Sequence, residues 1–298
     1  MRGETRQQAQ RMLMMGVLLA APVHAQTEQG LTFYTSFQGS ISDFGTIGRV
    51  DPNIGYKFNR FFEIDAGLPF YFVRPSDEVT PSFPSTSANG IGNFYTNFRF
   101  SVLSPVANYI SGVTVTAPTG DKEKGLSTGK VTWDWNNHFN KPLGSVAPFV
   151  NLGVANGISD TPFFIRPFLS RGTVSHFEGG INWKFWRAAG VGGSAYLYEP
   201  SGEQTVISRV VNRPAAVPPT GQSQGRGRRQ GVFASALETT GTAEIARDRG
   251  FSFWLDLIPN QVIFLEVGYS RSATYAFDTM YWSAGANVRS LIRNVRRQ

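Results

Sequence analysis

Short and long gaps alternate between the apolar segments of this chain, and this alternation restricts the folds it can adopt. After residue 30 there are roughly twelve β-type segments, each close to the ~9–11 residues with which a tilted strand crosses a membrane. Tight gaps lie at 59–60, 104–106, 140–144, 187–189 and 259–260. Between them the gaps are mostly long, at 74–89, 118–128, 157–172 and 200–248. The pattern predicts a single up-and-down antiparallel transmembrane β-barrel of about twelve strands, with the long loops outside the cell.

The segments themselves alternate between apolar and polar residues. In Phe61–Phe72, every second residue from Phe62 is apolar, and Glu63 and Asp65 fall on the other face. Successive side chains of a strand point to opposite faces, so one face is expected to contact lipid and the other the barrel interior. A soluble β-sandwich with its apolar face in a core is the alternative that periodicity leaves open.

Full charges fall within the polar sets. A lone Arg or Lys facing hydrocarbon costs about 2–4 kcal/mol near the bilayer midplane, so these residues are predicted to face the lumen. Both signs occur, and opposed charges could orient polar solutes in a pore. The predicted pore-lining residues are Glu63, Asp65, Arg99, Lys130, Asp134, Glu178 and Lys184.

The composition fits a lipid-facing barrel and excludes some chemistry. Charged residues make up 16% of the chain and aromatic residues 13%, and there is no cysteine. Thiol catalysis and cysteine–zinc sites are therefore excluded, and we expect neither a metal nor a cofactor. Basic residues gather at 226–229 and at 289–297 without interleaved aromatics, so nucleic acid is not an expected partner.

One stretch resembles a known family. The residues Val113–Lys122 read VTVTAPTGDK, and Gly125–Gly129 read GLSTG. This resembles the outer-membrane β-barrel family named for the MetA pathway of phenol degradation, in which a strand ends in Pro-Thr-Gly-Asp and Gly-x-Gly-Thr-Gly precedes the next strand. Gly90–Asn93 resembles the Gly-x-Gly-Asp of that family. The match covers roughly 90–157, and here Ser127 and Asn93 replace a Gly and an Asp.

The resemblance implies uptake of small, hydrophobic or aromatic compounds, with outer-membrane lipid and the barrel-assembly machinery as partners. Members of the family usually finish on a strand with a terminal aromatic residue, whereas Ser290–Gln298 is basic and has none. The loop at 200–248 is also longer than the family pattern. It carries several Pro and Gly residues and is expected either to fold inward as a plug or to be disordered.

Catalysis is not expected. Some outer-membrane barrels hydrolyse lipids, which needs a nucleophile and a base held together near the outer rim. His176 is predicted near that rim with Ser170 and Ser175 close in sequence, and His138 near the opposite end. A histidine lining a polar lumen is the simpler interpretation. We therefore expect a channel for small solutes in the bacterial outer membrane; the alternatives are a non-conducting structural or adhesive barrel and a lipid-modifying enzyme.

The first 25 residues match a secretory signal peptide. Arg2, Arg6 and Arg11 precede the apolar stretch Met12–Ala21, and Val23-His24-Ala25 offers small residues at a cleavage site. The expected organisation is therefore a signal peptide at 1–25 and a barrel at 26–298.

Export is predicted to remove residues 1–25, because the basic leader, apolar middle and small-residue end are the features that signal peptidase reads. N-terminal sequencing of the outer-membrane protein should begin at or near Gln26. An intact Met1 on the inserted protein would contradict this.

Overall fold

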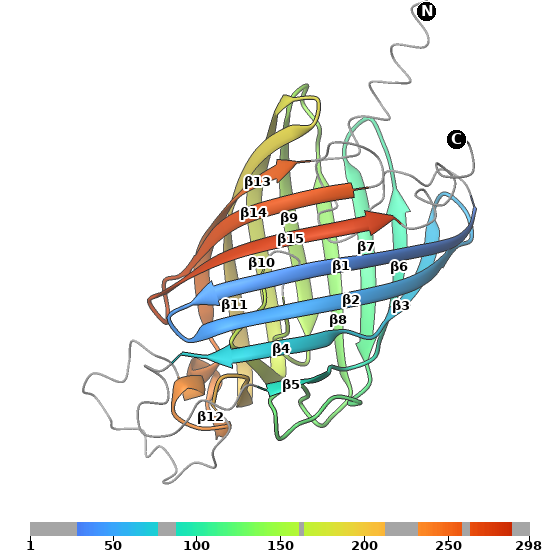
Figure 1. Cartoon of the computed structure of the whole chain (residues 1–298). Helices are drawn as coiled ribbons and strands as arrows, with labels where there is room; N and C mark the ends of the chain where they lie inside the picture. Colours follow the sequence, from blue (N-terminus) through green and yellow to red (C-terminus); the bar gives the residue numbers. More distant parts are fainter. Residues whose placement is uncertain (1–28, 77–87, 161–163, 212–231, 258–262, 288–298) are drawn as a thin grey trace, which may run out of the picture.

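A computed structural model describes residues 29–76, 88–160, 164–211, 232–257 and 263–287. The described chain is built almost wholly from strands that wrap into a barrel (Figure 1). The strands are β1 (Gly30–Ser42), β2 (Gly45–Lys57), β3 (Phe62–Gly67), β4 (Phe70–Pro75), β5 (Ala88–Ile91), β6 (Tyr95–Val102), β7 (Asn108–Thr116), β8 (Thr132–Asn140), β9 (Val146–Ala155), β10 (Phe168–Trp186), β11 (Ala189–Ser208), β12 (Glu238–Gly241), β13 (Asp248–Leu257), β14 (Ile263–Ser272) and β15 (Phe277–Asn287).

The sheet closes on itself. Each long strand pairs antiparallel with its neighbours in the sequence, and β1 pairs with both β2 and β15. Both β3 and β4 pair with β2 and together form one wall strand, which is interrupted at Leu68-Pro69. β5 and β6 form the next wall strand in the same way. The barrel therefore has twelve wall strands, and the predicted fold class and strand number are confirmed.

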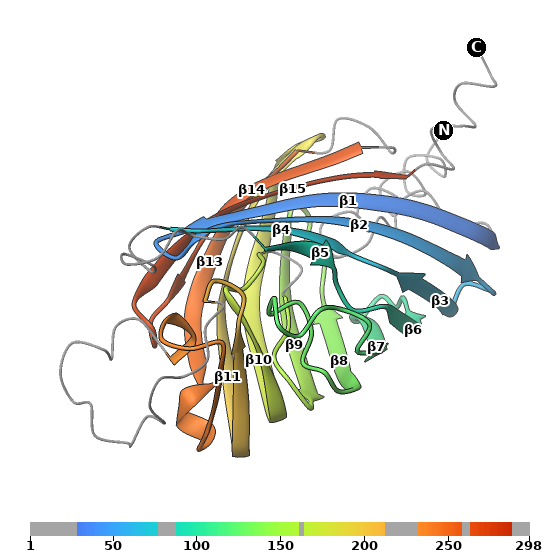
Figure 2. The same cartoon turned by 60° about the horizontal axis from the view of Figure 1, so that its bottom comes forward.

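The two ends of the barrel differ. The turn end carries the short connections at 58–61, 103–107, 141–145 and 187–188. The loop end carries the connections at 117–131, 156–167 and 209–247. Figure 2 is turned to bring the loop end forward; β1, β2 and β4 curve across one side, and β7 to β11 form the facing wall.

Several strands are longer than the sequence indicated. β1 and β2 extend to within two residues of each other, where segments at 31–38 and 50–58 were expected. β11 reaches Ser208, and β12 pairs with its end, so the loop predicted at 200–248 spans only 209–247. The additional residues of β1 and β2 include Gly39, Gly45 and Gly48, which interrupt the apolar alternation. Gly39 lies on the outer face and leaves the space that the exposed Trp282 indole of β15 occupies.

The outer face of the wall is apolar, as predicted. The phenylalanines, tryptophans and aliphatic residues assigned to lipid are exposed, and their neighbours in the sequence are partly or fully buried inside. Phe98 on β6 is 44% exposed, and its cross-strand partners Ile64 and Val113 lie on the same outer face. Such an exposed apolar belt on a closed sheet belongs in a bilayer. In the described part of the chain, no helix is long and apolar enough to cross a membrane.

Replacing Phe98 with Arg is expected to lower the free energy of unfolding by about 2–4 kcal/mol, because it places a charge in hydrocarbon. Phe98→Leu is the matched control and should change stability little. Urea unfolding in lipid vesicles, followed by heat-modified gel mobility, measures both variants. Equal stability of the two would show that this face does not contact lipid.

Candidate functional site: the barrel lumen

An apolar cap fills the mouth of the barrel at the loop end. Its side chains come from the β1–β2 turn, the 117–131 connection, both ends of the 209–247 connection and the β14–β15 turn, and they are almost completely buried. We define the apolar cap as Phe44, Ile47, Val73, Leu126, Ile158, Ile165, Phe168, Val206, Val210, Val211, Phe233, Tyr275 and Phe277.

Phe233 lies at the centre of the apolar cap. Its ring packs against Phe168 at 4.8 Å between centroids, against Phe44 at 4.9 Å and against Tyr275 at 5.4 Å. Phe233 belongs to the 3₁₀ turn Val232–Ala234 in the longest loop. The described end of this loop thus contributes to closing the mouth, in agreement with the inward-folding alternative for that loop.

The loop that resembles the phenol-degradation family also contributes to the cap. Leu126 is buried in it, and Gly125 has a φ of +68°. A Cβ at Gly125 would lie 1.9 Å from the carbonyl oxygen of Ser208, so only glycine fits against the end of β11. Lys122 Nζ lies 2.7 Å from Glu238 Oε2 and joins the same loop to β12.

An inward segment, residues 156–160 and 164–167, turns from the end of β9 into the lumen. Asp160 is its main anchor and is almost fully buried. Its carboxylate accepts hydrogen bonds from the Tyr71 hydroxyl at 2.7 Å, the Arg49 guanidinium at 3.2 Å and Arg209 Nη2 at 3.1 Å. Burial alone would raise the pKa of Asp160, but Arg209 and Arg49 outweigh it and lower the pKa to about 2.

A second anchor holds the other half of the inward segment. Arg166 Nη1 donates to Asp248 Oδ2 at 2.7 Å, and both side chains are 1% exposed. The guanidinium lies 4.3 Å from the Tyr198 ring centroid and 5.3 Å from that of Phe164. A buried charge needs both a counter-ion and polarisable neighbours, and this site supplies both. The two anchors fix the inward segment across the lumen.

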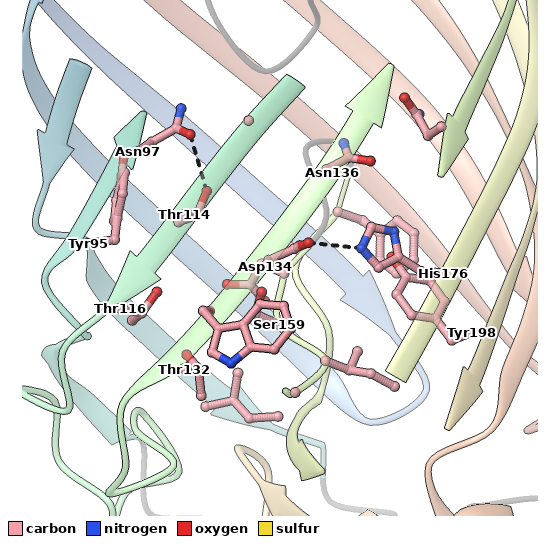
Figure 3. Close-up of a pocket in the computed structure, with 18 of the residues that line it drawn as sticks. Tyr95, Asn97, Thr114, Thr116, Thr132, Asp134, Asn136, Ser159, His176 and Tyr198 are labelled. Carbon is pink, nitrogen blue, oxygen red and sulfur yellow. Dashed lines mark hydrogen bonds and ion pairs between the residues drawn. The ribbon is translucent and has the colours of Figure 1, made fainter. Parts of the chain in front are cut away.

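A cavity of about 450 Å³ lies under the inward segment. Gly157, Ile158, Ser159, Asp160 and Phe164 form its roof, and the inward faces of β2, β4 and β6–β11 form its walls. Figure 3 shows polar side chains from several strands converging on this space, including Tyr95, Asn97, Asp134 and His176. The volume is within the range of small-molecule sites.

His176 and Asp134 form the polar contact at one side of the cavity. His176 Nε2 lies 2.9 Å from Asp134 Oδ1, and the two residues come from β10 and β8 (Figure 3). β9 runs between these strands, and Gly153 of β9 leaves room for the ring. A Cβ at Gly153 would lie 2.2 Å from His176 Cε1. The glycine thus permits a contact across an intervening strand.

A second row of polar side chains lies nearer the turn end than the contact between His176 and Asp134. His138 Nδ1 lies 2.6 Å from Asn151 Oδ1, and Asn151 Nδ2 donates to Glu178 Oε2 at 2.8 Å. These three residues occupy β8, β9 and β10 at paired positions. Strand register therefore brings together groups that lie far apart in the sequence.

The structure places the predicted pore-lining residues in three groups. Asp134, Glu178 and Arg99 line the cavity. Arg99 lies 3.4 Å from Asp65 and 3.8 Å from Glu63, so these two acids face the interior beside the cavity and neutralise an arginine. Lys184 is half-buried near the turn end of β10.

Lys130 departs from its predicted position. It was placed within a strand, but β8 begins at Thr132, and Lys130 lies exposed in the bend before it. Thr128 Oγ1 donates to the carbonyl oxygen of Lys130 at 3.0 Å and holds this bend. The local turn hydrogen bond thus ends the strand that the apolar alternation appeared to extend.

Sequence reasoning missed the residues that close the lumen. Asp160, Arg166 and Arg209 lie in connections where no periodicity operates, so no sequence signal marked them. Arg49 fell just outside the segment expected at 50–58 and could have been found by extending that segment, whereas Asp51 lay inside it. Asp256 and Glu266 could have been found too, because the leucine and valine residues on either side of each in the sequence face lipid, so the acid must face the interior.

The described residues do not contain a group of three or more His, Asp or Glu side chains placed to hold a metal ion. The lumen chemistry described above consists of hydrogen bonds, ion pairs and aromatic contacts. It suits reversible contact with a solute.

Comparisons with known proteins give a match in fold. No family model matches the sequence, and no curated protein matches it. The structure is similar to the COG4313 outer membrane channel from Pseudomonas putida F1, with a TM-score of 0.56 and 12% identity over 88% of this chain and 96% of that one. The NanC porin aligns with a TM-score of 0.48 and 6% identity, over 85% of this chain and 99% of that one.

The closed sheet and its exposed apolar belt are those of a membrane-spanning β-barrel, and the likeness to the COG4313 outer membrane channel is a likeness of fold. The apolar belt faces membrane lipid, and the inner face of the wall is polar. The MetA-pathway resemblance is not confirmed by these comparisons.

Asp160→Asn is predicted to destabilise the barrel by about 2 kcal/mol at pH 7, because it removes a buried carboxylate from two arginines. The pKa of Asp160 in the folded protein is about 2, below its ordinary 3.8, so this stability is present above about pH 4. It is lost as the pH falls toward 2, and the difference from the parent should shrink there.

Thermal unfolding of both proteins in detergent between pH 7 and pH 2 measures this difference. Asp121→Asn is the control, because Asp121 lies in an exposed loop and its side chain is 41% exposed. A difference between Asp160→Asn and the parent that does not vary with pH would contradict the assigned anchor.

Proposed function

We propose that the barrel carries small solutes across the outer membrane through its lumen, with the loop end facing outside. The observation that supports this most directly is the polar inner face, which continues below the apolar cap and encloses a cavity. A barrel without a transport role could fill its interior with apolar side chains, whereas this one keeps charged and amide groups around an open space.

We also propose that the solutes include aromatic compounds. The cavity is lined by the rings of Tyr71, Tyr95, Phe149, Phe164 and Tyr198 as well as by polar groups. Aromatic faces pair well with aromatic solutes, and hydroxyl and amide groups fix their orientation. This agrees with the substrate class that the phenol-degradation resemblance implies.

Passage requires the apolar cap and the inward segment to move. The cap is held by packing around Phe233, and the segment by the ion pairs of Asp160 and Arg166. These contacts join the connections to side chains of the wall, such as Phe168 on β10 and Asp248 on β13. They are separate from the backbone hydrogen bonds that close the barrel, so they could rearrange while the wall stays intact. Insertion by the barrel-assembly machinery is part of the proposal.

Catalysis is not part of the proposed function. A lipid hydrolase would need a serine beside His176, but His176 Nε2 lies against Asp134, and the Ser170 hydroxyl accepts from the Ile158 amide at 2.9 Å. A lipase assay on the folded barrel tests this, and hydrolysis that depends on His176 would overturn it.

Planar-bilayer recording tests the channel. The parent should conduct weakly because its mouth is capped, and Phe233→Ala should raise the open fraction several-fold by removing the centre of the cap. Phe251→Ala, on the lipid-facing side of β13, is the matched control and should behave as the parent. If neither the parent nor Phe233→Ala conducts while both are folded, the non-conducting structural barrel is the better description.

A further inference from the structure

The carboxylates of the lumen divide into two groups. The inward arginines all have acidic partners: Arg49 pairs with Asp51 and Asp160, Arg99 with Glu63 and Asp65, Arg166 with Asp248, and Arg209 with Asp160. Within the described part of the chain, these four arginines therefore face five carboxylates, and each positive charge has an acidic partner. Among the described residues, four other inward carboxylates form no ion pair with Lys or Arg, and these are Asp134, Glu178, Asp256 and Glu266.

The four unneutralised carboxylates share one side of the lumen. They lie on β8, β10, β13 and β14, whereas Arg49 and Arg99 lie on β2 and β6. Asp134 stands near the loop end of its strand and Glu178 near the middle of β10. Asp256 and Glu266 are cross-strand partners near the turn end. The order along the barrel axis is therefore a stepwise row of carboxyl groups from mouth to base, in which Asp256 and Glu266 hydrogen-bond to each other.

The upper part of this row faces the cavity. The Asp134 side chain is 41% exposed, and both Asp134 and Glu178 line the cavity under the inward segment. Two further lining atoms, Asn136 Oδ1 and His138 Nε2, are buried without a hydrogen-bond partner among the described residues. Polar atoms left unpaired in a closed space are costly unless a solute or water binds them.

Aromatic rings stand beside these acids. Tyr198 stacks on His176 with 5.7 Å between centroids, and Phe149 stacks on His138 at 5.8 Å. A cation placed between a carboxylate and an aromatic face gains from both, and the gain is larger where water is excluded. An anion at the same place would meet unneutralised carboxylates and be repelled.

We propose that this cavity binds small organic cations, in particular protonated aromatic amines, in preference to neutral or anionic aromatics. Asp134 and Glu178 hold the ammonium group, and the rings of Tyr198 and Phe149 contact the aromatic part. Asp256 and Glu266 offer the next negative position toward the turn end. This inference deepens the proposed function by naming a solute class, and it rests on that function only for passage.

Calorimetric titration of the detergent-solubilised barrel with benzylamine, benzyl alcohol and benzoate tests the binding preference. The three probes share one ring and differ in charge. Benzylamine should bind at least ~10-fold more tightly than benzyl alcohol, which corresponds to about 1.4 kcal/mol, and benzoate should bind most weakly. The measurement is repeated on Phe233→Ala, so that a capped mouth does not hide the site.

The double variant Asp134→Asn, Glu178→Gln should lose the preference for benzylamine while binding benzyl alcohol as before. The control is Asp278→Asn, which removes one carboxylate near the loop end on the outer face and should leave the preference intact. Heat-modified gel mobility shows that each variant is folded, and the comparison of the three probes in the parent tests the proposal without any variant.

Equal binding of the three probes, or a preference that survives in the folded double variant, would overturn the inference. Reversal potentials of Phe233→Ala in a KCl gradient distinguish failure of this inference from failure of the proposed channel function. A cation preference that falls when Asp134→Asn and Glu178→Gln are added to Phe233→Ala supports the inference. An anion preference refutes the inference but remains consistent with the proposed channel function. Selective benzylamine binding without conductance supports the solute class and refutes passage.

Discussion

The pairing of β1 with β15 is the constraint on which the rest of the structure depends. No water is available in the hydrocarbon of a bilayer to satisfy exposed backbone groups, so a membrane-spanning sheet must close and leave no edge. Closure fixes the pleat of every strand, so one side chain in two meets lipid and the next faces the lumen. The apolar belt and the polar lumen are two results of the same hydrogen-bond geometry.

Charges inside such a lumen must be matched. The arginines that enter it are paired with acids, and two of these acids, Asp160 and Asp248, secure the inward segment through Arg209 and Arg166. A buried ion pair adds little net stability but is costly to break, so it specifies one position of a loop more than it strengthens the fold. The inward segment is thus held by specific side-chain contacts, which are separate from the backbone hydrogen bonds of the wall.

The pairing of charges divides the lumen into two regions. Each inward arginine among the described residues is paired with an acid, whereas β8, β10, β13 and β14 carry inward carboxyl groups that form no ion pair with Lys or Arg. The aromatic rings beside Asp134 and Glu178 give that side of the cavity an apolar component as well. The proposed solute preference depends on which charges remain after structural pairing is complete.

The sequence by itself determined the fold, because a period of two and the alternation of short and long gaps are local properties that closure requires of each strand. It also assigned Glu63, Asp65, Asp134 and Glu178 to the inward face, since parity along a strand needs no tertiary knowledge. Only the tertiary structure decided that the mouth is capped, that Asp160 joins Arg49 and Arg209, and that His176 reaches Asp134 over Gly153. These contacts join connections and strands distant in the sequence, where no periodicity records which side chains will meet.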